Sequence, residues 1–412
     1  MSENTQYDEN AGSGMFERHY VKTIVDRISE TNNPLMQVVV GPRQTGKSTM
    51  LGQALAKIDT EQFFISADDA IVPSEEWLQV EWQQARNATR SGSRPVVLVV
   101  DEIQKVPHWS LVVKSLYDAD RRNDMPVRVV LSGSSSLLLH KGLEDSLMGR
   151  FELIHSPHWS YSECFQAFGF SFDDYLYYGG YPGAARFASD DARWISYIRE
   201  AIIEPTISQD VLALEDIRKP ALMRALFRLG ATYSARELSY TKMLGQLQDA
   251  GNTVTVAHYL DLLDKAGMLC GIQKYDAKEV RRRKSSPRFM VYDTSLMTAS
   301  SGIEKSRYLG EPDLRGHLVE SAVGARLLAR ASEEGLGVYW WREGIKEVDF
   351  VVSKGFDSLS AIEVKSGKEK GQSGMADFLS AHPSAKRIVV GGAASGACGV
   401  EEFLKDEVEL FY

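Results

Sequence analysis

The feature that most constrains this chain is a glycine-bounded loop near its N-terminus. An apolar run, Val38–Val40, precedes the loop and predicts a buried strand, while an amphipathic segment with Met50, Leu51, Ala54 and Leu55 follows it and predicts a helix. The loop reads Gly41, Pro42, Arg43, Gln44, Thr45, Gly46, Lys47, Ser48 and Thr49. Its two glycines and its Lys-Ser pair have the spacing of a phosphate-binding loop between a strand and a helix.

The residues of this loop have distinct physical roles. Gly41 and Gly46 let the backbone turn tightly and approach an anion without a Cβ atom in between. The loop N–H groups and the helix N-terminus then face the phosphates. Lys47 supplies a positive charge for the β- and γ-phosphates, and the Ser48 hydroxyl can bind Mg²⁺. ATP and Mg²⁺ are therefore the expected cofactors; the alternative, a chance Gly-Lys-Ser turn, does not explain the flanking strand and helix.

A second apolar run, Pro95–Val100, ends in the carboxylates Asp101 and Glu102. Its continuous apolar character predicts a strand covered on both faces, as in a parallel sheet. Open α/β sheets bind ligands at the carboxyl ends of their strands. We expect Asp101 to hold the Mg²⁺ shell and Glu102 to orient and polarise the attacking water. The alternative is a strand that ends in acidic residues for solubility alone.

Two further positions in this region are possible catalytic residues. The stretch Val127–Leu131, apolar except for Arg128, predicts another buried strand. The serines that follow it could sense the γ-phosphate or position water, with Ser132 the first choice and Ser134 the second. A serine-rich turn without a catalytic role fits that pattern equally well. Arg150 precedes the predicted strand Phe151–Ile154 and could neutralise transition-state charge on a neighbouring subunit's nucleotide. A solvated surface arginine is an equal alternative.

The middle of the chain predicts a winged helix-turn-helix. A short helix is expected at Ser234–Leu238, a longer one after Gly251, and two strands at 268–272 and 289–292. In such a module the second helix enters the DNA major groove and the wing contacts phosphates. The expected hairpin tip carries Arg281, Arg282, Arg283 and Lys284, which suit phosphate contact. The alternatives are a wing that packs between subunits and a tip that is merely solvated. Asp261 and Asp264 on the second helix argue against strong sequence reading, so the expected DNA contact is mainly non-specific.

The C-terminal region places charged residues in the order of a restriction-endonuclease-like site. Glu320 lies on a predicted helix, Asp349 on a strand, and Glu363 and Lys365 on one face of a later strand. The carboxylates would hold Mg²⁺ or Mn²⁺, and Lys365 would act on a hydrolytic water. Alternating charges on a solvated strand give the same pattern, and such domains can also serve only to bind.

These motifs together resemble a large family of prokaryotic AAA+-type ATP-binding proteins with a C-terminal domain similar to restriction-type nucleases. The resemblance is carried by Gly41–Thr49, Asp101-Glu102, Ser132-Gly133-Ser134 and Leu147–Arg150, with the later stretches Pro157–Glu163 and Gly179–Gly183. It covers nearly the whole chain beyond the first residues. The resemblance implies a homo-oligomer such as a ring and favours Arg150 as its arginine finger.

Length and composition set the remaining expectations. A chain of 412 residues is too long for one ordinary core. The net charge of −9 requires any nucleic-acid contact to come from a local basic patch. Three scattered cysteines, a polar and acidic N-terminus, and the lack of a membrane-spanning apolar run favour a cytoplasmic protein.

The expected fold is α/β and multidomain. Its parts are a disordered tail (1–14), a P-loop AAA+ core with a five-stranded parallel sheet (15–156), a helical lid (157–215), a winged-helix domain (216–312) and a PD-(D/E)xK nuclease-like domain (313–412). The expected function is a Mg²⁺-dependent ATPase that binds DNA and remodels it or moves along it, in genome maintenance or phage defence. Two alternatives stay open: nucleotide-switched assembly with a protein partner, and a DNA nuclease gated by ATP.

Overall fold

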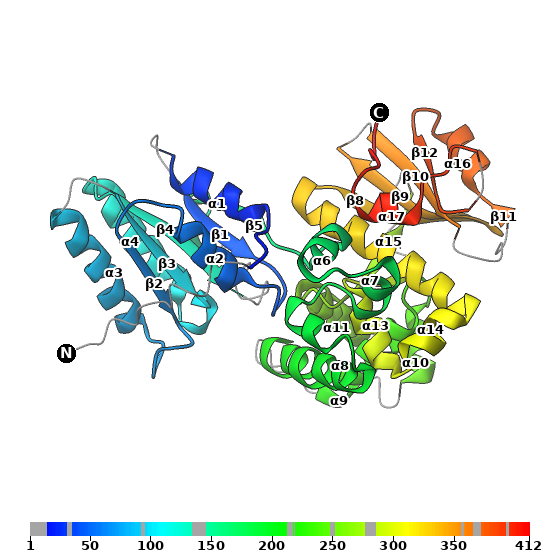
Figure 1. Ribbon diagram of the computed structural model, residues 1–412, viewed down its shortest axis with the longest axis horizontal. Coiled ribbons are helices and arrows are strands. Elements are labelled where there is room, and N and C mark those ends of the chain that lie inside the picture. Colours follow the sequence, from blue (N-terminus) through cyan, green and yellow to red (C-terminus); the bar gives the residue numbers. More distant parts are fainter. Residues whose placement is uncertain are drawn as a thin grey trace. The chain divides into compact units, whose positions relative to one another are not determined.

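The computed structural model forms two compact units, which meet in the sequence between Ser156 and Pro157 (Figure 1). It describes residues 15–30, 35–91, 95–133, 146–211, 217, 219–247, 252–276, 286–355, 358–365, 372–392 and 395–412. The predicted tail over 1–14, the serine Ser134 and the basic run Arg281–Lys284 lie outside the described residues. Each unit is described by itself below.

The first unit is built on a five-stranded sheet with the order β2-β3-β4-β1-β5, in which every neighbouring pair is parallel. The strands are β1 (Met36–Val40), β2 (Gln62–Ser66), β3 (Val96–Asp101), β4 (Val127–Gly133) and β5 (Phe151–His155). Every residue of β1 and β3 is buried, as continuous apolar runs predict for strands covered on both faces. The predicted five-stranded parallel sheet is confirmed.

Helices cover both faces of this sheet (Figure 1). They are α1 (Tyr20–Ile28), α2 (Lys47–Leu55), α3 (Glu75–Ser91) and α4 (Trp109–Arg122), with a short 3₁₀ turn, η1 (Ile103–Lys105), after β3. Helices α1 and α2 pack against Val39 and Val99, whereas α3 and α4 pack against Val38 and Val40. Because neighbouring strand residues point to opposite faces, the two helix pairs lie on opposite sides of the sheet.

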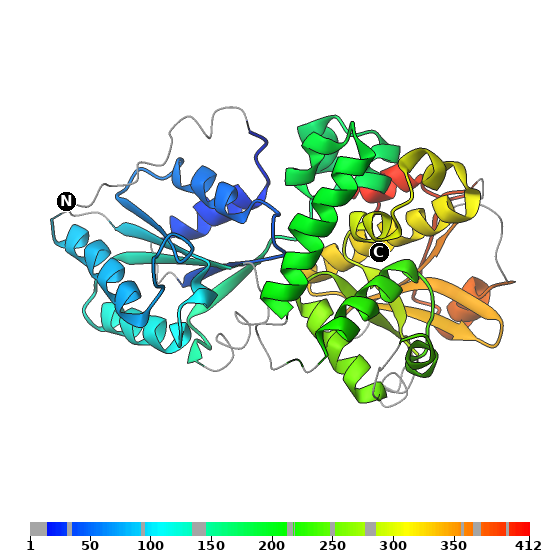
Figure 2. The same ribbon diagram turned by 90° about the horizontal axis from the view of Figure 1, so that it is seen from below.

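The second unit begins with a helical segment. It contains α6 (Tyr161–Phe168), α7 (Phe172–Tyr178), the 3₁₀ turn η2 (Pro182–Phe187), α8 (Asp191–Tyr197), and the π-helical segments η3 (Ile198–Ile203) and η4 (Thr206–Val211). From Asp191 to Val211 these segments follow one another as a continuous green helical run in Figure 2. The predicted lid residues therefore belong to the compact unit that starts at Pro157.

The next segment contains the helices and hairpin expected of the middle region, with one correction. It runs through α9 (Pro220–Thr232), α10 (Tyr240–Gln246), α11 (Thr253–Lys265), β6 (Leu269–Lys274) and β7 (Arg288–Val291). The predicted helix at Ser234–Leu238 is wrong, because the backbone there turns at Ala235 (φ 63°) and runs beside β7. Ala235 N–H donates to Phe289 O at 2.8 Å, and Phe289 N–H donates to Arg236 O at 3.0 Å. The short helix starts instead at Tyr240, capped by the Ser239 hydroxyl.

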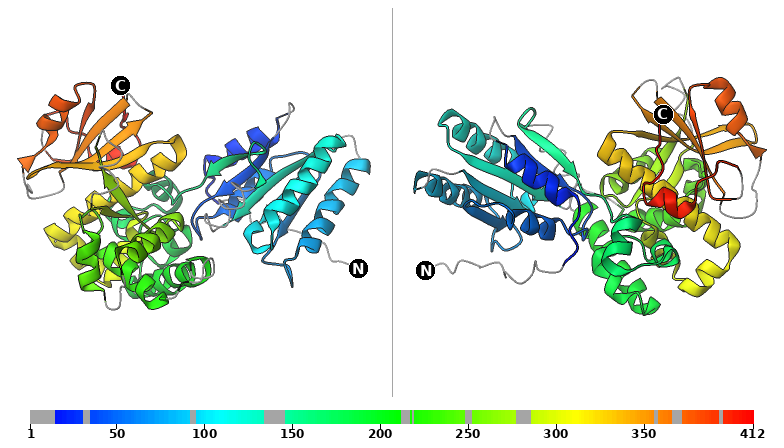
Figure 3. Two further views of the ribbon diagram at one scale, coloured as in Figure 1. Left: turned by 180° about the vertical axis from the view of Figure 1, so that it is seen from behind. Right: turned by 45° about the horizontal axis from the view of Figure 1, so that its top comes forward.

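The C-terminal segment adds a larger sheet and its covering helices (Figure 3). The elements are α13 (Thr294–Ser301), α14 (Lys305–Gly310), α15 (Pro312–Glu334), β8 (Gly337–Glu343), β9 (Lys346–Lys354), β10 (Ser358–Val364), β11 (Gln372–Ser373), α16 (Met375–Ala381), β12 (Lys386–Val390) and α17 (Val400–Leu404). Phe350 lies near α15, and its neighbour Val351 packs in the cluster of α16, so these two helices cover opposite faces.

The sheet of this unit continues across the predicted boundary at residue 313. Its main path is β12-β10-β9-β8-β6-β7. Strand β6 joins β8 in parallel through Gln273 and Lys274, opposite Tyr339 and Trp340. No helix among the described residues is long and apolar enough to cross a membrane.

Candidate nucleotide site

The phosphate-loop motif connects β1 to α2 at the carboxyl edge of the parallel sheet. A Cβ atom on Gly41 would lie 2.1 Å from the carbonyl oxygen of Ser156, so only glycine fits there. Gly46 has a φ of 85° and precedes the first residue of α2. Residues with a side chain rarely adopt that backbone conformation, so glycine is favoured at position 46. Glycine is required at position 41 for a different reason, the close approach of Ser156.

Lys47 is the first residue of α2 and is buried. Its ammonium donates to the carbonyl oxygens of Gly41 at 3.0 Å and Pro42 at 2.6 Å. The Thr45 hydroxyl also donates to Pro42 O, at 3.0 Å. These bonds fix the positive charge of Lys47 within the loop, at the end of the sheet where phosphates are expected.

Asp101 is the residue on which three elements converge. Its Oδ2 accepts a hydrogen bond from the Ser48 hydroxyl at 2.6 Å, and its Oδ1 accepts one from the Ser132 hydroxyl. Oδ1 also accepts the backbone N–H of Glu102 at 3.0 Å. The structure thus brings together three of the predicted residues, which come from α2, β3 and β4. A buried carboxylate with adjacent hydroxyl oxygens is the hard donor set that Mg²⁺ prefers, so these residues fit the ion.

Glu102 leaves the strand with an unusual backbone conformation. Its φ is 51°, which a residue other than glycine rarely adopts, and such strain concentrates at functional sites. The carboxylate Oε2 accepts a hydrogen bond from the Gln104 side-chain amide at 2.5 Å. The contact of Gln104 with Glu102 was not predicted from the sequence. Its only signal was a polar side chain two positions after the expected base.

Arg150 is held on the surface of its own unit. Its guanidinium forms a two-pronged pair with Asp118 of α4, with Nε–Oδ1 at 2.7 Å and Nη2–Oδ2 at 3.0 Å. This hydrogen bonding lowers the pKa of the Asp118 carboxyl. Within the described residues, the side-chain hydrogen bonds of Arg150 go to Asp118 and to Met148 O, and none goes to the phosphate loop. Asp118 was also missed, since nothing in the sequence pairs it with Arg150.

The C-terminal charged residues are brought only partly together. Glu320 and Asp349 both lie near the guanidinium of Arg288, whose Nη1 is 3.4 Å from Glu320 Oε1 and 3.7 Å from Asp349 Oδ1. Glu363 instead pairs with Lys365 at 2.7 Å. Burial raises the pKa of Asp349, and the charge of Arg288 opposes that shift. Among the described residues no group of three His, Cys, Asp or Glu side chains could hold a metal ion. The Arg288 guanidinium thus lies beside two of the carboxylates that were predicted to hold a metal ion.

The two later stretches that carry the family resemblance have a structural role. Trp159 N–H donates to Gly180 O at 3.1 Å, which joins the stretch 157–163 to the stretch 179–183. Gly180 N–H donates to the buried Asp293 carboxylate at 2.7 Å, and Asp293 caps α13. A Cβ atom on Gly180 would lie 2.2 Å from Trp159 O. These motifs therefore fix the packing of α6, α7 and α13.

Comparison with known proteins places three domains along the chain. Residues 33–165 match the family model of an AAA domain. Residues 169–307 and 315–397 each match a domain of unknown function, DUF8612 and DUF4143 respectively.

Relatives of this chain carry no assigned function. An uncharacterised protein of Haemophilus influenzae is 21% identical over 346 residues, which cover 79% of this chain and 81% of the relative. An uncharacterised protein of Mycobacterium tuberculosis is 29% identical over 309 residues, which cover 74% of this chain but only 64% of the relative.

A solved structure of the Aeropyrum pernix ORC1 protein in complex with DNA aligns over 68% of this chain and 91% of its own. The identity is 13% and the TM-score is 0.30, an overlap too loose to support any conclusion. The assignment depends instead on the parallel sheet, its phosphate loop and the family match. Residues 33–165 are thus similar to an AAA domain of the P-loop ATPase family.

Proposed function

We propose that the chain is a Mg²⁺-dependent ATPase whose nucleotide is bound by the loop from Gly41 to Thr49. The observation that carries the proposal is the convergence on Asp101. The hydroxyls of Ser48 and Ser132, from different elements of one parallel sheet domain, both donate to its carboxylate next to the phosphate loop. The spacing of the motif in the sequence predicts a phosphate-binding loop. The hydrogen bonds to Asp101 add an arrangement of side chains that is suited to ATP hydrolysis.

The chain's own residues divide the work of hydrolysis. Mg²⁺ bound with ATP supplies neutralisation of the charge on the phosphates and the transferred group. Ser48 and Asp101 would hold the ion, and Lys47 would donate to the phosphates in place of the loop carbonyls. Glu102 would accept the proton of the attacking water, with Gln104 fixing its carboxylate. Ser132 would contact the γ-phosphate or the water.

The experiment that tests this proposal is isothermal titration of ATP and Mg²⁺ into the Lys47→Ala variant. Hydrogen bonds to charged groups contribute about 1.5–3 kcal/mol, so the affinity should fall by about 10–100-fold. Lys57→Ala is the matched control, because Lys57 pairs with Glu17 on the surface and should leave affinity unchanged. Wild-type affinity in Lys47→Ala would refute the assignment.

We also propose a mainly non-specific DNA contact for the segment from α9 to β7. The stretch 235–238 runs beside β7, so the order is helix, extended strand, two helices and a hairpin, which supports a winged helix-turn-helix. The two acidic side chains of α11 that argued against DNA contact both have partners within the protein. Asp264 accepts a hydrogen bond from the Tyr292 hydroxyl at 2.5 Å, and Asp261 pairs with Lys265 at 2.9 Å. The basic run from Arg281 to Lys284 falls between β6 and β7 in the sequence.

The oligomeric state and the cellular location of the protein are also proposals. A homo-oligomer is proposed from the possible role of Arg150 in trans, and a cytoplasmic location from the composition. Nucleotide-controlled assembly with a protein partner is the competing function. ATP turnover that DNA stimulates, and that salt suppresses, would favour the DNA role over the protein partner.

A further inference from the structure

A buried arginine occupies the centre of the C-terminal carboxylate cluster. Arg288, on β7, is 2% exposed. Its guanidinium pairs with Glu347 of β9 and lies within 4 Å of the carboxylates of Glu320 and Asp349. It also donates to the main-chain carbonyl oxygen of Asp349 at 3.1 Å. A full positive charge therefore lies between two of the carboxylates expected to bind a metal ion.

The other charges of the cluster are also paired. Asp349 Oδ2 accepts the backbone N–H of Val364 at 2.8 Å. Arg342 donates to Glu347 Oε2 at 3.0 Å, and Lys365 pairs with Glu363 at 2.7 Å. A divalent cation placed here would be repelled by the Arg288 guanidinium at short range, in an interior where charge interactions are weakly screened.

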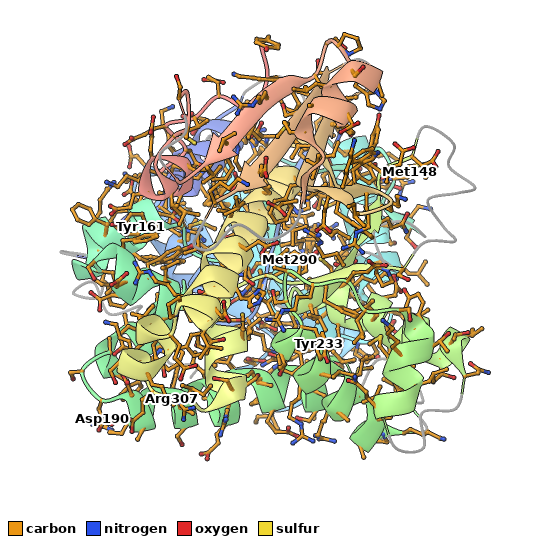
Figure 4. The ribbon with its side chains drawn as sticks, turned by 90° about the vertical axis from the view of Figure 1, so that its right-hand side faces the viewer. Met148, Tyr161, Asp190, Tyr233, Met290 and Arg307 are labelled. Carbon is orange, nitrogen blue, oxygen red and sulfur yellow. The ribbon has the colours of Figure 1, made fainter. Side chains whose placement is uncertain are left out.

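The packing around β7 fixes Arg288 in this place. Met290 lies two positions along the strand and packs against α15, as Figure 4 shows. A Cβ atom on Gly324 of α15 would lie 2.4 Å from the Met290 sulfur, so glycine permits the close approach. The Arg288 guanidinium also lies 5.2 Å from the centre of the Trp340 ring, a favourable cation–π distance.

We propose that Arg288 is a fixed internal counter-ion, in the place that a metal ion would take in a nuclease-like site, and that this cluster does not support metal-dependent cutting of DNA. The carboxylates then tie β7 to α15 and β9 rather than activating water. This inference is independent of the proposed ATPase function, because it concerns a separate cluster of residues. It predicts that the ATP-gated nuclease alternative is wrong.

The first test uses the wild-type protein and its Asp349→Asn variant, with the nicking assay run without nucleotide, with ATP and with a non-hydrolysable ATP analogue, and the Mn²⁺-binding assay run without nucleotide. Supercoiled plasmid is incubated with each protein in millimolar Mn²⁺, and Mn²⁺ binding is measured by electron paramagnetic resonance. We expect no nicking above background and the same amount of bound Mn²⁺ for both proteins. Nicking or Mn²⁺ binding that Asp349→Asn removes would overturn the proposal.

The second test removes the counter-ion. Arg288→Met should lower the melting temperature in EDTA, because three carboxylates lose their shared cation. The Mn²⁺ affinity of the variant should be more than about tenfold higher than that of the wild-type protein. Adding Mn²⁺ should also raise the melting temperature of the variant part of the way back to the wild-type value. Arg342→Met is the matched control, since Arg342 also bonds Glu347 but lies at the more exposed rim, and it should gain no Mn²⁺ affinity.

If a folded Arg288→Met variant has a melting temperature that does not respond to Mn²⁺, the proposal that the Arg288 guanidinium occupies the position of a metal ion is contradicted. Should Arg288→Met fail to fold, the wild-type measurements of nicking and Mn²⁺ binding decide the question alone. Neither readout depends on ATP turnover, so failure of this inference and failure of the ATPase proposal are distinguishable.

Discussion

Asp101 and Glu102 are neighbours with opposite surroundings. Asp101 is buried and accepts hydrogen bonds from two serine hydroxyls, which suits a residue that orients ligands. Glu102 turns out of the strand through a left-handed conformation, and its carboxylate accepts a hydrogen bond from the Gln104 side chain. This difference supports the proposed roles, in which Asp101 holds Mg²⁺ and Glu102 accepts the proton of the attacking water.

The division of tasks predicts the kinetics of two variants. Glu102→Gln should bind ATP normally but lower kcat by about 10²–10⁴-fold, the range for loss of a general base. Gln104→Leu should lower kcat less and leave ATP affinity unchanged, because it only positions Glu102. Steady-state ATPase assays with titration calorimetry separate these effects. Normal turnover in Glu102→Gln would remove Glu102 from the role of base.

At the scale of elements, close contacts between motifs decide where helices start and how they pack. Gly180 brings the turn after α7 against Trp159 and donates to Asp293, the residue that caps α13. Similarly, the backbone near Ala235 forms hydrogen bonds to β7 rather than a helix. Neither contact could be deduced from local pattern, because each depends on a segment distant in the sequence.

The tight contact at Gly180 predicts a stability loss. Gly180→Ala should destabilise the second unit by about 1–3 kcal/mol, because the added Cβ atom forces backbone to move. Gly245→Ala is the control, since Gly245 lies in α10 with nothing within 4 Å of its added Cβ. That substitution should be neutral or stabilising by up to about 1 kcal/mol. Urea unfolding followed by tryptophan fluorescence measures both; equal stabilities would show that the contact is not tight in solution.

At the scale of the whole molecule, Arg150 is proposed to act on the nucleotide of a second subunit. To do so, it would have to leave its ion pair with Asp118. Each side chain of the pair is 31% exposed. Exposed ion pairs contribute about 0–1 kcal/mol, and the bidentate geometry places this pair toward the upper end of that range, so its opening has a modest free-energy cost. An arginine released from it could act on a neighbouring subunit's nucleotide.

Mixing variants tests this shared site. Arg150→Ala should lower kcat by about 10³-fold or more if the arginine stabilises the transition state. Mixing Arg150→Ala with Lys47→Ala subunits should restore some hydrolysis, because one kind supplies the nucleotide site and the other the arginine. The measurement is ATP turnover against mixing ratio. An absence of rescue in mixed oligomers would leave Arg150 as a surface residue.

The proposed DNA binding gives a prediction for the whole chain. Replacing Arg281, Arg282, Arg283 and Lys284 with alanine should weaken binding to unrelated duplexes to a similar degree. The slope of log affinity against log salt should fall by about one unit for each phosphate that the variant no longer neutralises. Fluorescence anisotropy at several salt concentrations measures it, with Lys22→Ala as a surface control. An unchanged slope would assign DNA binding to another surface or exclude it.

The sequence by itself predicted the candidate nucleotide site and determined the parallel sheet of the first unit. The loop from Gly41 to Thr49 is contiguous in the sequence, and the strands that carry Asp101 and Ser132 are mostly apolar. Parallel strands bring their carboxyl ends to one edge, so residues far apart in the chain could be placed together from local pattern alone. The helix expected at Ser234–Leu238 was wrong, because this stretch forms hydrogen bonds to β7, which lies far away in the sequence.

Only the tertiary structure decided which charged groups meet in the C-terminal region. Arg288 and Asp349 lie 61 positions apart, and no spacing rule connects them. The pattern of Glu320, Asp349, Glu363 and Lys365 predicted a possible metal site, but it could not show that the Arg288 guanidinium lies beside Glu320 and Asp349. A buried arginine from another strand changes the chemistry of such a cluster, because the pairing of buried charges depends on distances that folding alone sets.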